Sequence, residues 1–231
     1  MHSLLRIKVR GIHSGIGRAA SGLIRRERSF LSEGTRTFSS STKSQRLAAR
    51  SQTNDWINRL VIGKGLCPWA AEPFYNGSLR IQIVEGDRGD YLLDSVKREI
   101  ASLLSSDSKE TTTLVVFPDS FERFGELKSF EYEILESIHG EGLFEEVQVV
   151  AFHPKGVHSL YSCEEMPTPY DYVTRAPYPT IHLLRTVDLV KANKQMGGDT
   201  EKVPTANVKK MEGMGIKAIE REWTFSGRER G

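Results

Sequence analysis

The chain has 231 residues, enough for one or two domains. Its formal net charge of +2 is the sum of a positive N-terminal segment and a negative remainder. Residues 1–50 hold 11 Lys or Arg and 2 Asp or Glu, whereas residues 51–231 hold 21 and 28, a formal −7. A domain of that charge has no general attraction for nucleic acid, which is therefore not an expected partner. Two cysteines make no disulfide framework, and no stretch approaches the roughly 20 apolar residues of a membrane span.

The first fifty residues have the composition of an organelle-targeting presequence. They are rich in Arg and Ser and poor in acidic residues. Apolar residues recur at spacings of three and four, which makes one stripe on a helix: Leu5, Val9, Ile12, Ile16, Ala20 and Leu23. The run from Arg36 to Ser41 resembles a matrix-protease cleavage site. We expect residues 1–50 to be a cleaved, disordered presequence for the mitochondrial matrix; the alternatives are a plastid destination and a disordered basic tail.

The following residues predict one α/β domain over 51–222 and a flexible tail over 223–231. Thr53 is expected to cap a helix that runs to about Ile62 and ends at Gly63 and Gly65. Strands and helices then alternate, over residues 79–84, 90–104, 112–117, 121–139 and 147–152. This alternation favours parallel pairing. The expected fold is a three-layer-like α/β sandwich with a small, mainly parallel sheet (a β-α-β-α-β core) and flanking helices.

The segment from His153 to Tyr178 has no periodic pattern. A loop of that length inside a domain is usually functional or disordered. Pro179 is expected to start a helix that reaches about Asn193, and Pro204–Met214 is expected to form a short final helix.

Polar residues follow each predicted strand. In open parallel sheets, ligands bind at the carboxyl ends of the strands. The residues expected there are Glu85, Asp87, Pro118, Asp119, His153 and Pro154. Arg175 lies ahead of the predicted helix at Pro179, and an arginine beside free helical N–H groups predicts an anion site. The alternative is that Arg175 pins the loop through carbonyls or an acidic partner.

Two histidines and one cysteine are further candidates. His182 lies in the first turn of the predicted helix, where the dipole favours a neutral imidazole that suits a base, a donor or a metal ligand; the alternative is a histidine that caps the fold. His153 lies at the end of a predicted strand, a position where functional residues of α/β sheets are often found. Cys67 acts as a nucleophile only if a neighbour lowers its pKa, and otherwise is a buried free thiol. Zinc bound by Cys67, His153 and His182 is a conjecture about geometry.

Several motifs resemble one protein family. They are Leu66-Cys67-Pro68-Trp69-Ala70, Val116-Phe117-Pro118-Asp119, Phe152-His153-Pro154 and the long string from Tyr172 to Arg185. Over about residues 53–214 the chain resembles the bacterial and organellar family labelled domain of unknown function 1415. The resemblance implies a shared fold and a set of positions: Cys67, His153, Arg175, Tyr178 and His182.

The chain departs from the pattern of that family at three places. Lys155-Gly156-Val157-His158 stands where an aromatic residue follows the His-Pro pair within a few positions. Thr174 stands where Asn is frequent, and Thr186 stands where an acidic residue is frequent. If these side chains complete a pocket, the ligand of this protein differs.

Three functions compete on these residues. The first is an enzyme, a hydrolase or group transferase for a small anionic metabolite, with His153 or His182 as base or electrophile, Asp119 orienting it and Cys67 as nucleophile. In this reading Arg175, with Tyr172 and Tyr178, holds the anion. The second is a metal-dependent enzyme or metal-binding protein with zinc on Cys67, His153 and His182. The third is a non-catalytic module that binds an anionic ligand. No motif requires a cofactor.

Overall fold

The structure, a computed structural model, describes residues 43–105, 107–158, 163–195, 197 and 202–224. All of these belong to the unit formed by residues 40–231. The predicted presequence up to residue 42 and the tail from residue 225 lie outside the described residues. No helix in the described ranges is both long and apolar enough to cross a membrane.

Four strands form one mixed sheet. They are β1 (Leu79–Ile83), β2 (Thr112–Val116), β3 (Val147–Phe152) and β4 (Thr180–Arg185), in the order β1-β2-β4-β3. β1 and β2 are parallel, whereas β4 is antiparallel to both of its neighbours, β2 and β3. The α/β class is therefore confirmed, but the sheet is mixed and not mainly parallel.

The prediction that a helix starts at Pro179 is wrong, because Thr180–Arg185 is a central strand of the sheet. Ile181 and Leu183 are buried and alternate with His182, as the period of a strand requires. Pairing with β2 on one side and β3 on the other decides the conformation, and a local pattern does not reveal such long-range partners. The helix that was expected there starts only at Thr186, as α5 (Thr186–Gln195).

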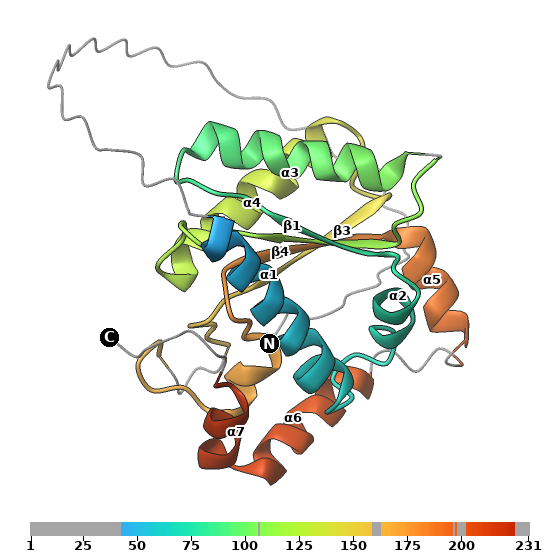
Figure 1. The fold of residues 1–231 in the computed structure, drawn as a ribbon. Helices are drawn as coiled ribbons and strands as arrows, with labels where there is room; N and C mark the ends of the chain where they lie inside the picture. Colours follow the sequence, from blue (N-terminus) through green and yellow to red (C-terminus); the bar gives the residue numbers. More distant parts are fainter. Residues whose placement is uncertain (1–42, 106, 159–162, 196, 198–201, 225–231) are drawn as a thin grey trace, which may run out of the picture. The chain divides into compact units, whose positions relative to one another are not determined.

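Helices α3 (Gly89–Leu104) and α4 (Phe124–Gly140) cover one face of the sheet (Figure 1). Their apolar stripes meet the side chains that point to that face of the strands. The largest core cluster results, with Val96, Ile100, Leu127, Phe130, Ile134, Val115, Phe117, Ile181 and Leu183 among its buried residues. The sequence predicted both helices close to their observed bounds.

Helix α1 (Lys43–Trp56) and the π-helix η1 (Ile57–Ile62) lie on the other face. Ala49, Trp56 and Leu60 are buried there against β1 and β2. Thr53 does not cap the helix, since its hydroxyl lies inside α1 and donates to the Ala49 carbonyl at 2.8 Å. The helix therefore begins well ahead of the predicted start, and the expected boundary at residue 50 falls within it.

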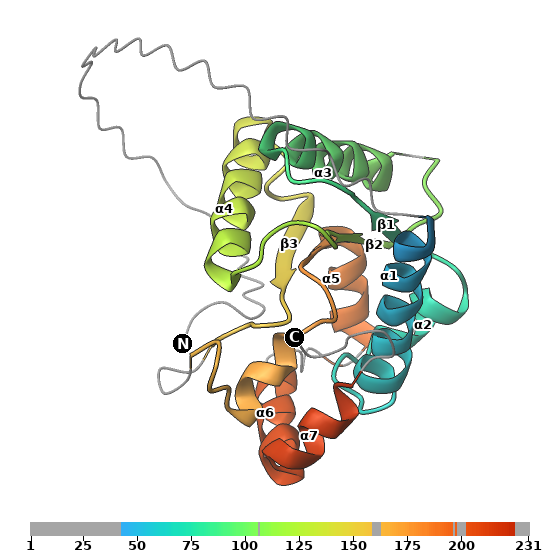
Figure 2. The same cartoon turned by 60° about the vertical axis from the view of Figure 1, so that its left-hand side comes forward.

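Helices α6 (Lys202–Met214) and α7 (Ile216–Glu222) lie below the sheet in Figure 2 and pack against the 3-10 helix η2 (Pro169–Thr174) of the long loop. A short helix, α2 (Ala71–Tyr75), follows η1 in the chain. The third cluster contains Leu66, Tyr172, Met211 and Ile219. Trp223, expected in a flexible tail, packs edge-on against Tyr172 with ring centres 5.1 Å apart.

Candidate anion-binding site

Three strand ends meet the start of β4 along one edge of the sheet. Ile83, Val116, Thr180 and Phe152 form one row of paired residues across the four strands. Because β4 runs against both neighbours, β3 runs in the same direction as β2 although the two are not adjacent. The segments that follow β1, β2 and β3 therefore leave the sheet at the same edge, even though the sheet is mixed.

Arg175 lies beside this edge, because Thr174 accepts a hydrogen bond from the His153 N–H at 3.4 Å. The Arg175 side chain is buried, with the residue only 7% exposed. Its Nε donates to the Gly156 carbonyl at 3.1 Å, and its guanidinium carbon lies 4.8 Å from the centre of the Tyr172 ring. Arg175 therefore does fix the loop through a carbonyl, which was the alternative to an anion-binding role.

One nitrogen at the other end of the Arg175 guanidinium has no hydrogen-bond partner, although the group also interacts with Tyr172. Nη2 is buried and has no hydrogen-bond partner among the described residues, and Arg175 forms no ion pair with a carboxylate of that part of the chain. Burial lowers the pKa of Arg175, while Tyr172 and Asp171 act in the opposite direction. A buried cation without a paired carboxylate is costly, so this nitrogen is a candidate ligand for an anion.

His158 lies in the same loop and was not singled out by the sequence. Its backbone N–H donates to Asp171 Oδ1 at 2.7 Å, and its ring packs against Phe124 and Tyr170. The ring nitrogen Nε2 is buried without a partner in the described ranges. Burial lowers the pKa of His158, Asp171 raises it, and Lys128 and Arg175 lower it. The one feature of the sequence that pointed to His158 was the departure from the family pattern at Lys155-Gly156-Val157-His158.

Two carboxylates surround the loop without pairing with Arg175. Asp171 is fully buried and accepts hydrogen bonds from the Thr168 N–H and hydroxyl, in a capping box at the start of η2. Glu164 Oε1 accepts from the Phe124 N–H, at the first residue of α4, at 2.9 Å. Both charges attract Arg175 from a distance. The site therefore combines a free cationic nitrogen with carboxylates that already have other partners.

His153 connects two loops of the edge. Its Nδ1 accepts from the Lys155 N–H at 3.0 Å, so that nitrogen carries no proton and Nε2 donates to the Phe121 carbonyl at 2.8 Å. Phe121 has a φ of 60°, the left-handed backbone that an aromatic residue rarely adopts. Burial lowers the pKa of His153. Both ring nitrogens thus hold the backbone, which leaves none for a substrate.

His182 lies on the opposite face of the sheet from His153. It is paired with Leu114 of β2 and Val150 of β3. Thr112 Oγ1 donates to the Leu183 carbonyl at 3.1 Å, so it accepts from His182 Nε2 at 2.6 Å. Burial lowers the pKa of His182 to about 4. The imidazole is neutral, as the sequence predicted, but the cause is burial on a strand and not a helix dipole.

Cys67 lies in the turn after η1, and α6 holds this turn through Asn207, whose Nδ2 donates to the Leu66 carbonyl at 2.6 Å. Burial raises the pKa of the Cys67 thiol, and the N–H groups of Trp69 and Ala70 lower it to a smaller extent. The sulfur is therefore a neutral thiol at physiological pH and a weak nucleophile.

The remaining predicted residues do not join a catalytic group. Asp119 is exposed and accepts from the Gly86 N–H at 3.3 Å, so it ties two loops together and orients no imidazole. Tyr178 packs with the α1 cluster, whereas Tyr172 lies under Arg175. Within the described ranges no three His, Cys, Asp or Glu residues could hold a metal ion, so Cys67, His153 and His182 form no such group.

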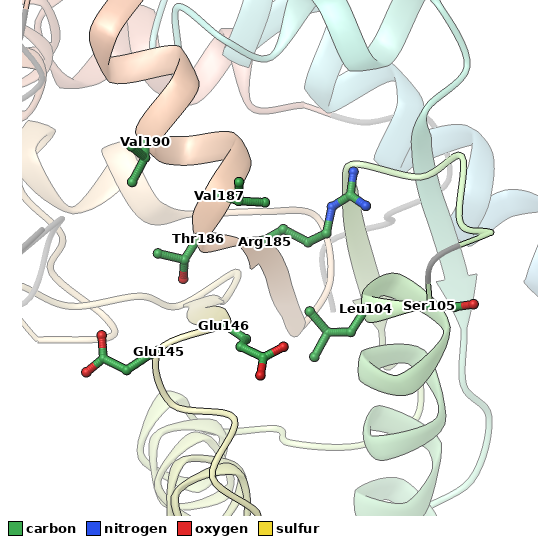
Figure 3. Close-up of a pocket in the computed structure, with 8 residues that line it drawn as sticks. All are labelled: Leu104, Ser105, Glu145, Glu146, Arg185, Thr186, Val187 and Val190. Atoms are coloured by element: carbon green, nitrogen blue, oxygen red, sulfur yellow. The ribbon is translucent and has the colours of Figure 1, made fainter.

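Two shallow hollows lie elsewhere on the surface. One, of about 530 Å³, opens at the far end of β4 and the start of α5, where Arg185, Thr186 and Val190 face Glu145, Glu146, Leu104 and Ser105 (Figure 3). The other, of about 280 Å³, lies between α1 and β1 and is lined by Lys43, Arg46, Leu47, Arg50, Gln82 and Ile83. Thr186, one of the departures from the family pattern, lines the first hollow, but neither hollow is lined by a predicted catalytic or anion-binding residue.

Comparison with known proteins gives one match. Residues 48–221 match the family described as protein of unknown function (DUF1415). No curated protein and no solved structure matches the chain. The match covers most of the chain and nearly all of the described fold, from α1 to α7. The chain therefore belongs to the DUF1415 family.

Proposed function

We propose that this protein binds a small anionic molecule, a phosphate or a carboxylate, through Arg175 at the carboxyl edge of the sheet. The observation that carries the proposal is the buried Nη2 of Arg175, which has no partner within the described chain. An arginine nitrogen bonds carboxylates and phosphates strongly, and burial strengthens the attraction further. A bound anion would supply the negative charge that neither Asp171 nor Glu164 gives directly.

The geometry favours binding over catalysis. A hydrolase or transferase needs an available base or nucleophile near the anion. His153 has both ring nitrogens bonded to backbone, His182 is on the other face of the sheet, and burial favours the neutral thiol of Cys67. We therefore propose a non-catalytic anion-binding module in preference to the enzyme.

A thermal-shift series tests this function. The full chain is melted in sodium chloride, acetate, phosphate and sulfate at equal ionic strength, because a ligand that binds only the folded state raises Tm. We expect at least one of the three anions to raise Tm relative to chloride, and the effect to vanish in Arg175→Met. Arg185→Met is the matched control, since Arg185 lies at the far end of β4 and pairs with Asp188. An equal shift in Arg175→Met would exclude the proposal.

We also propose that the segment ahead of α1 is a mitochondrial presequence, with a plastid as the alternative destination. The support is its Arg-rich, acid-poor composition. Cleavage ahead of Lys43 would keep the described part of α1 whole, and α1 buries Ala49 in the domain core. Import of the full chain into isolated mitochondria, followed by N-terminal sequencing, tests this; a mature N-terminus beyond Ala49 would contradict it.

A further inference from the structure

We propose that the open edge of β1 is a docking site for an acidic, extended segment of a partner protein. The segment adds to β1 as a further strand of the sheet, and its carboxylates face the cations of α1. Arg175 takes no part in this surface, so the inference is independent of the proposed anion binding.

One side of β1 has no neighbouring strand within the described chain. β1 stands at the end of the sheet and pairs only with β2. The Val84 N–H, just after β1, donates to the Val116 carbonyl at 2.9 Å, so even-numbered residues turn their N–H and C=O groups toward β2. Odd-numbered residues, Ile81 and Ile83 among them, therefore turn theirs outward. The side-chain amide of Gln82 donates to the Ile83 carbonyl at 3.4 Å, where a neighbouring strand would otherwise bond.

The other edge of the sheet is closed by the protein itself. On β3, the Ala151 N–H points outward and donates to Glu131 Oε1 at 3.0 Å, and Glu131 is a buried residue of α4. None of the described helices bonds an outward backbone group of β1 in the same way. An open strand edge is a template for pairing with another chain. Of the two edges, β1 is thus the one that can accept a strand.

A hollow of about 280 Å³ lies at this open edge, because it is lined by both Gln82 and Ile83. Adjacent side chains of a strand point to opposite faces, and the Gln82 amide reaches across to the outward carbonyl of Ile83. The other wall of the hollow is one face of α1, made by residues at spacings of three and four: Lys43, Arg46, Leu47 and Arg50. A chain laid along β1 would lie against this face of the helix.

The charge of this helix face selects an acidic segment. Lys43 and Arg50 are exposed, and neither forms an ion pair with a described residue. Arg46 pairs with Glu85 at 3.6 Å, which neutralises one of the three cations. Side chains on one face of a strand recur with period two, so carboxylates at every second residue of the added strand would all face α1.

The chain's own segments fit this edge poorly. In an antiparallel dimer of two β1 strands, the two-fold axis is perpendicular to the sheet, which puts both α1 helices on the same face with their cations close together. Residues 1–42 hold 8 Lys or Arg and 2 Asp or Glu, so the segment that precedes α1 is repelled as well. The complementary occupant is an acidic strand from another protein.

Titration of a labelled heptapeptide into the full chain tests the docking. The probe alternates four glutamates with three threonines, which favour extended backbone. The double variant Lys43→Glu/Arg50→Glu should raise the Kd of this peptide at least about tenfold, because two attractive charges become repulsive. The matched control is Lys209→Glu/Lys217→Glu, which makes the same charge change at exposed positions of α6 and α7. Its Kd should stay within about twofold of the wild type.

Two N-methylated forms of the same peptide test the backbone pairing, one methylated at every glutamate and the other at every threonine. The N–H groups of one residue type all point to the same side of an alternating strand. Strand addition therefore predicts that one form binds at least about tenfold more weakly than the parent peptide, whereas the other binds as the parent does. Equal affinities of the two forms, or an unchanged Kd in Lys43→Glu/Arg50→Glu, would overturn the proposal.

The same titrations separate this surface from other occupants. Arg175→Met should bind the acidic peptide as the wild type does, and a loss of binding in that variant would assign the peptide to the anion site instead. A dimer of the chain that dissociates in Lys43→Glu/Arg50→Glu, without any peptide binding, would assign the edge to a second copy. Either result would overturn the proposal.

Discussion

Arg175 fills one of the two roles that its sequence position suggested, and it has a nitrogen left for the other, which is proposed here. Its Nε holds the Gly156 carbonyl, which fixes the loop, and its Nη2 stays buried without a partner. The first interaction is worth roughly 1.5–3 kcal/mol for a charged donor. The desolvation of the cation costs several kcal/mol in the absence of a paired anion, which offsets that gain.

Arg175→Met should therefore change the free energy of unfolding little in the absence of a bound anion. Met still packs against the Tyr172 ring, but it removes the hydrogen bond, the buried charge and its cation–π contact with that ring. We expect a change within about 1 kcal/mol in urea unfolding of the full chain in chloride buffer. A loss of about 3 kcal/mol or more would show that Arg175 is a structural pin whose partners already satisfy it.

His182 gives the protein a defined sensitivity to acid. Its pKa falls from 6.5 to about 4 because the ring is buried, so the folded state resists protonation. The free energy of unfolding is therefore unaffected by His182 above pH 6.5. It decreases as the pH falls from 6.5 toward 4, because the unfolded chain binds a proton at this histidine and the folded chain does not. The full effect is about 3 kcal/mol.

His182→Gln should flatten this acid dependence, since glutamine still donates to Thr112 Oγ1 and does not titrate. Urea unfolding between pH 7 and about 4 measures it. His153 and His158 also have lowered pKa values, so a smaller slope remains. His139→Gln, at an exposed position of α4, is the control and should retain the slope of the wild type. Equal slopes in both variants would contradict the assignment.

At the scale of single residues, the sequence predicted positions better than roles. Arg175 and His153 do lie at the sheet edge, because strand ends can be read from local patterns. Their hydrogen bonds could not be predicted, since His153 bonds the carbonyl of Phe121, whose φ of 60° has no signature in an aromatic residue. His158 was missed because its loop has no period from which a buried position can be read.

Elements with strong local periods were predicted almost to their ends. α3 and α4 have long apolar stripes, and β2 is a continuous β-branched run buried along its length. The sequence of β4 predicts a helix, because Ile181, Leu184 and Val187 also fit a helical spacing, yet Thr180–Arg185 is a strand. Its identity depends on β2 and β3, which lie far away in sequence and pair with it on both sides.

Helix α1 makes a prediction about truncation. Residues 43–50 lie in the first half of this helix, and within it Ala49 is fully buried and its carbonyl accepts from Thr53. Deletion of residues 1–50 should lower the free energy of unfolding by at least about 2 kcal/mol, because α1 loses buried surface and its first turns.

Deletion of residues 1–42 is the matched control and should leave the urea midpoint unchanged, since it keeps the whole of α1. Equal midpoints for the two deletions would show that residues 43–50 do not stabilise the domain. The result also bears on processing, because a protease that cut after residue 50 would release a weakened domain.

In the whole molecule, the mixed sheet still brings the carboxyl ends of three strands to one edge, which is where the proposed site lies. Inserting β4 between β2 and β3 changes the pairing, yet the carboxyl ends of β1, β2 and β3 stay on one edge. The long loop returns to this edge, with Glu164 at the start of α4 and Arg175 beside His153. Residues far apart in sequence thus meet at a position that the strand order alone would not reveal.

The most direct test of the account is isothermal titration of acetate, phosphate and sulfate into the full chain at constant ionic strength. We expect saturable binding of one anion per chain, lost in Arg175→Met and retained in Arg185→Met. Saturable binding that survives in Arg175→Met, or no binding of any of the three anions to the wild type, would contradict it.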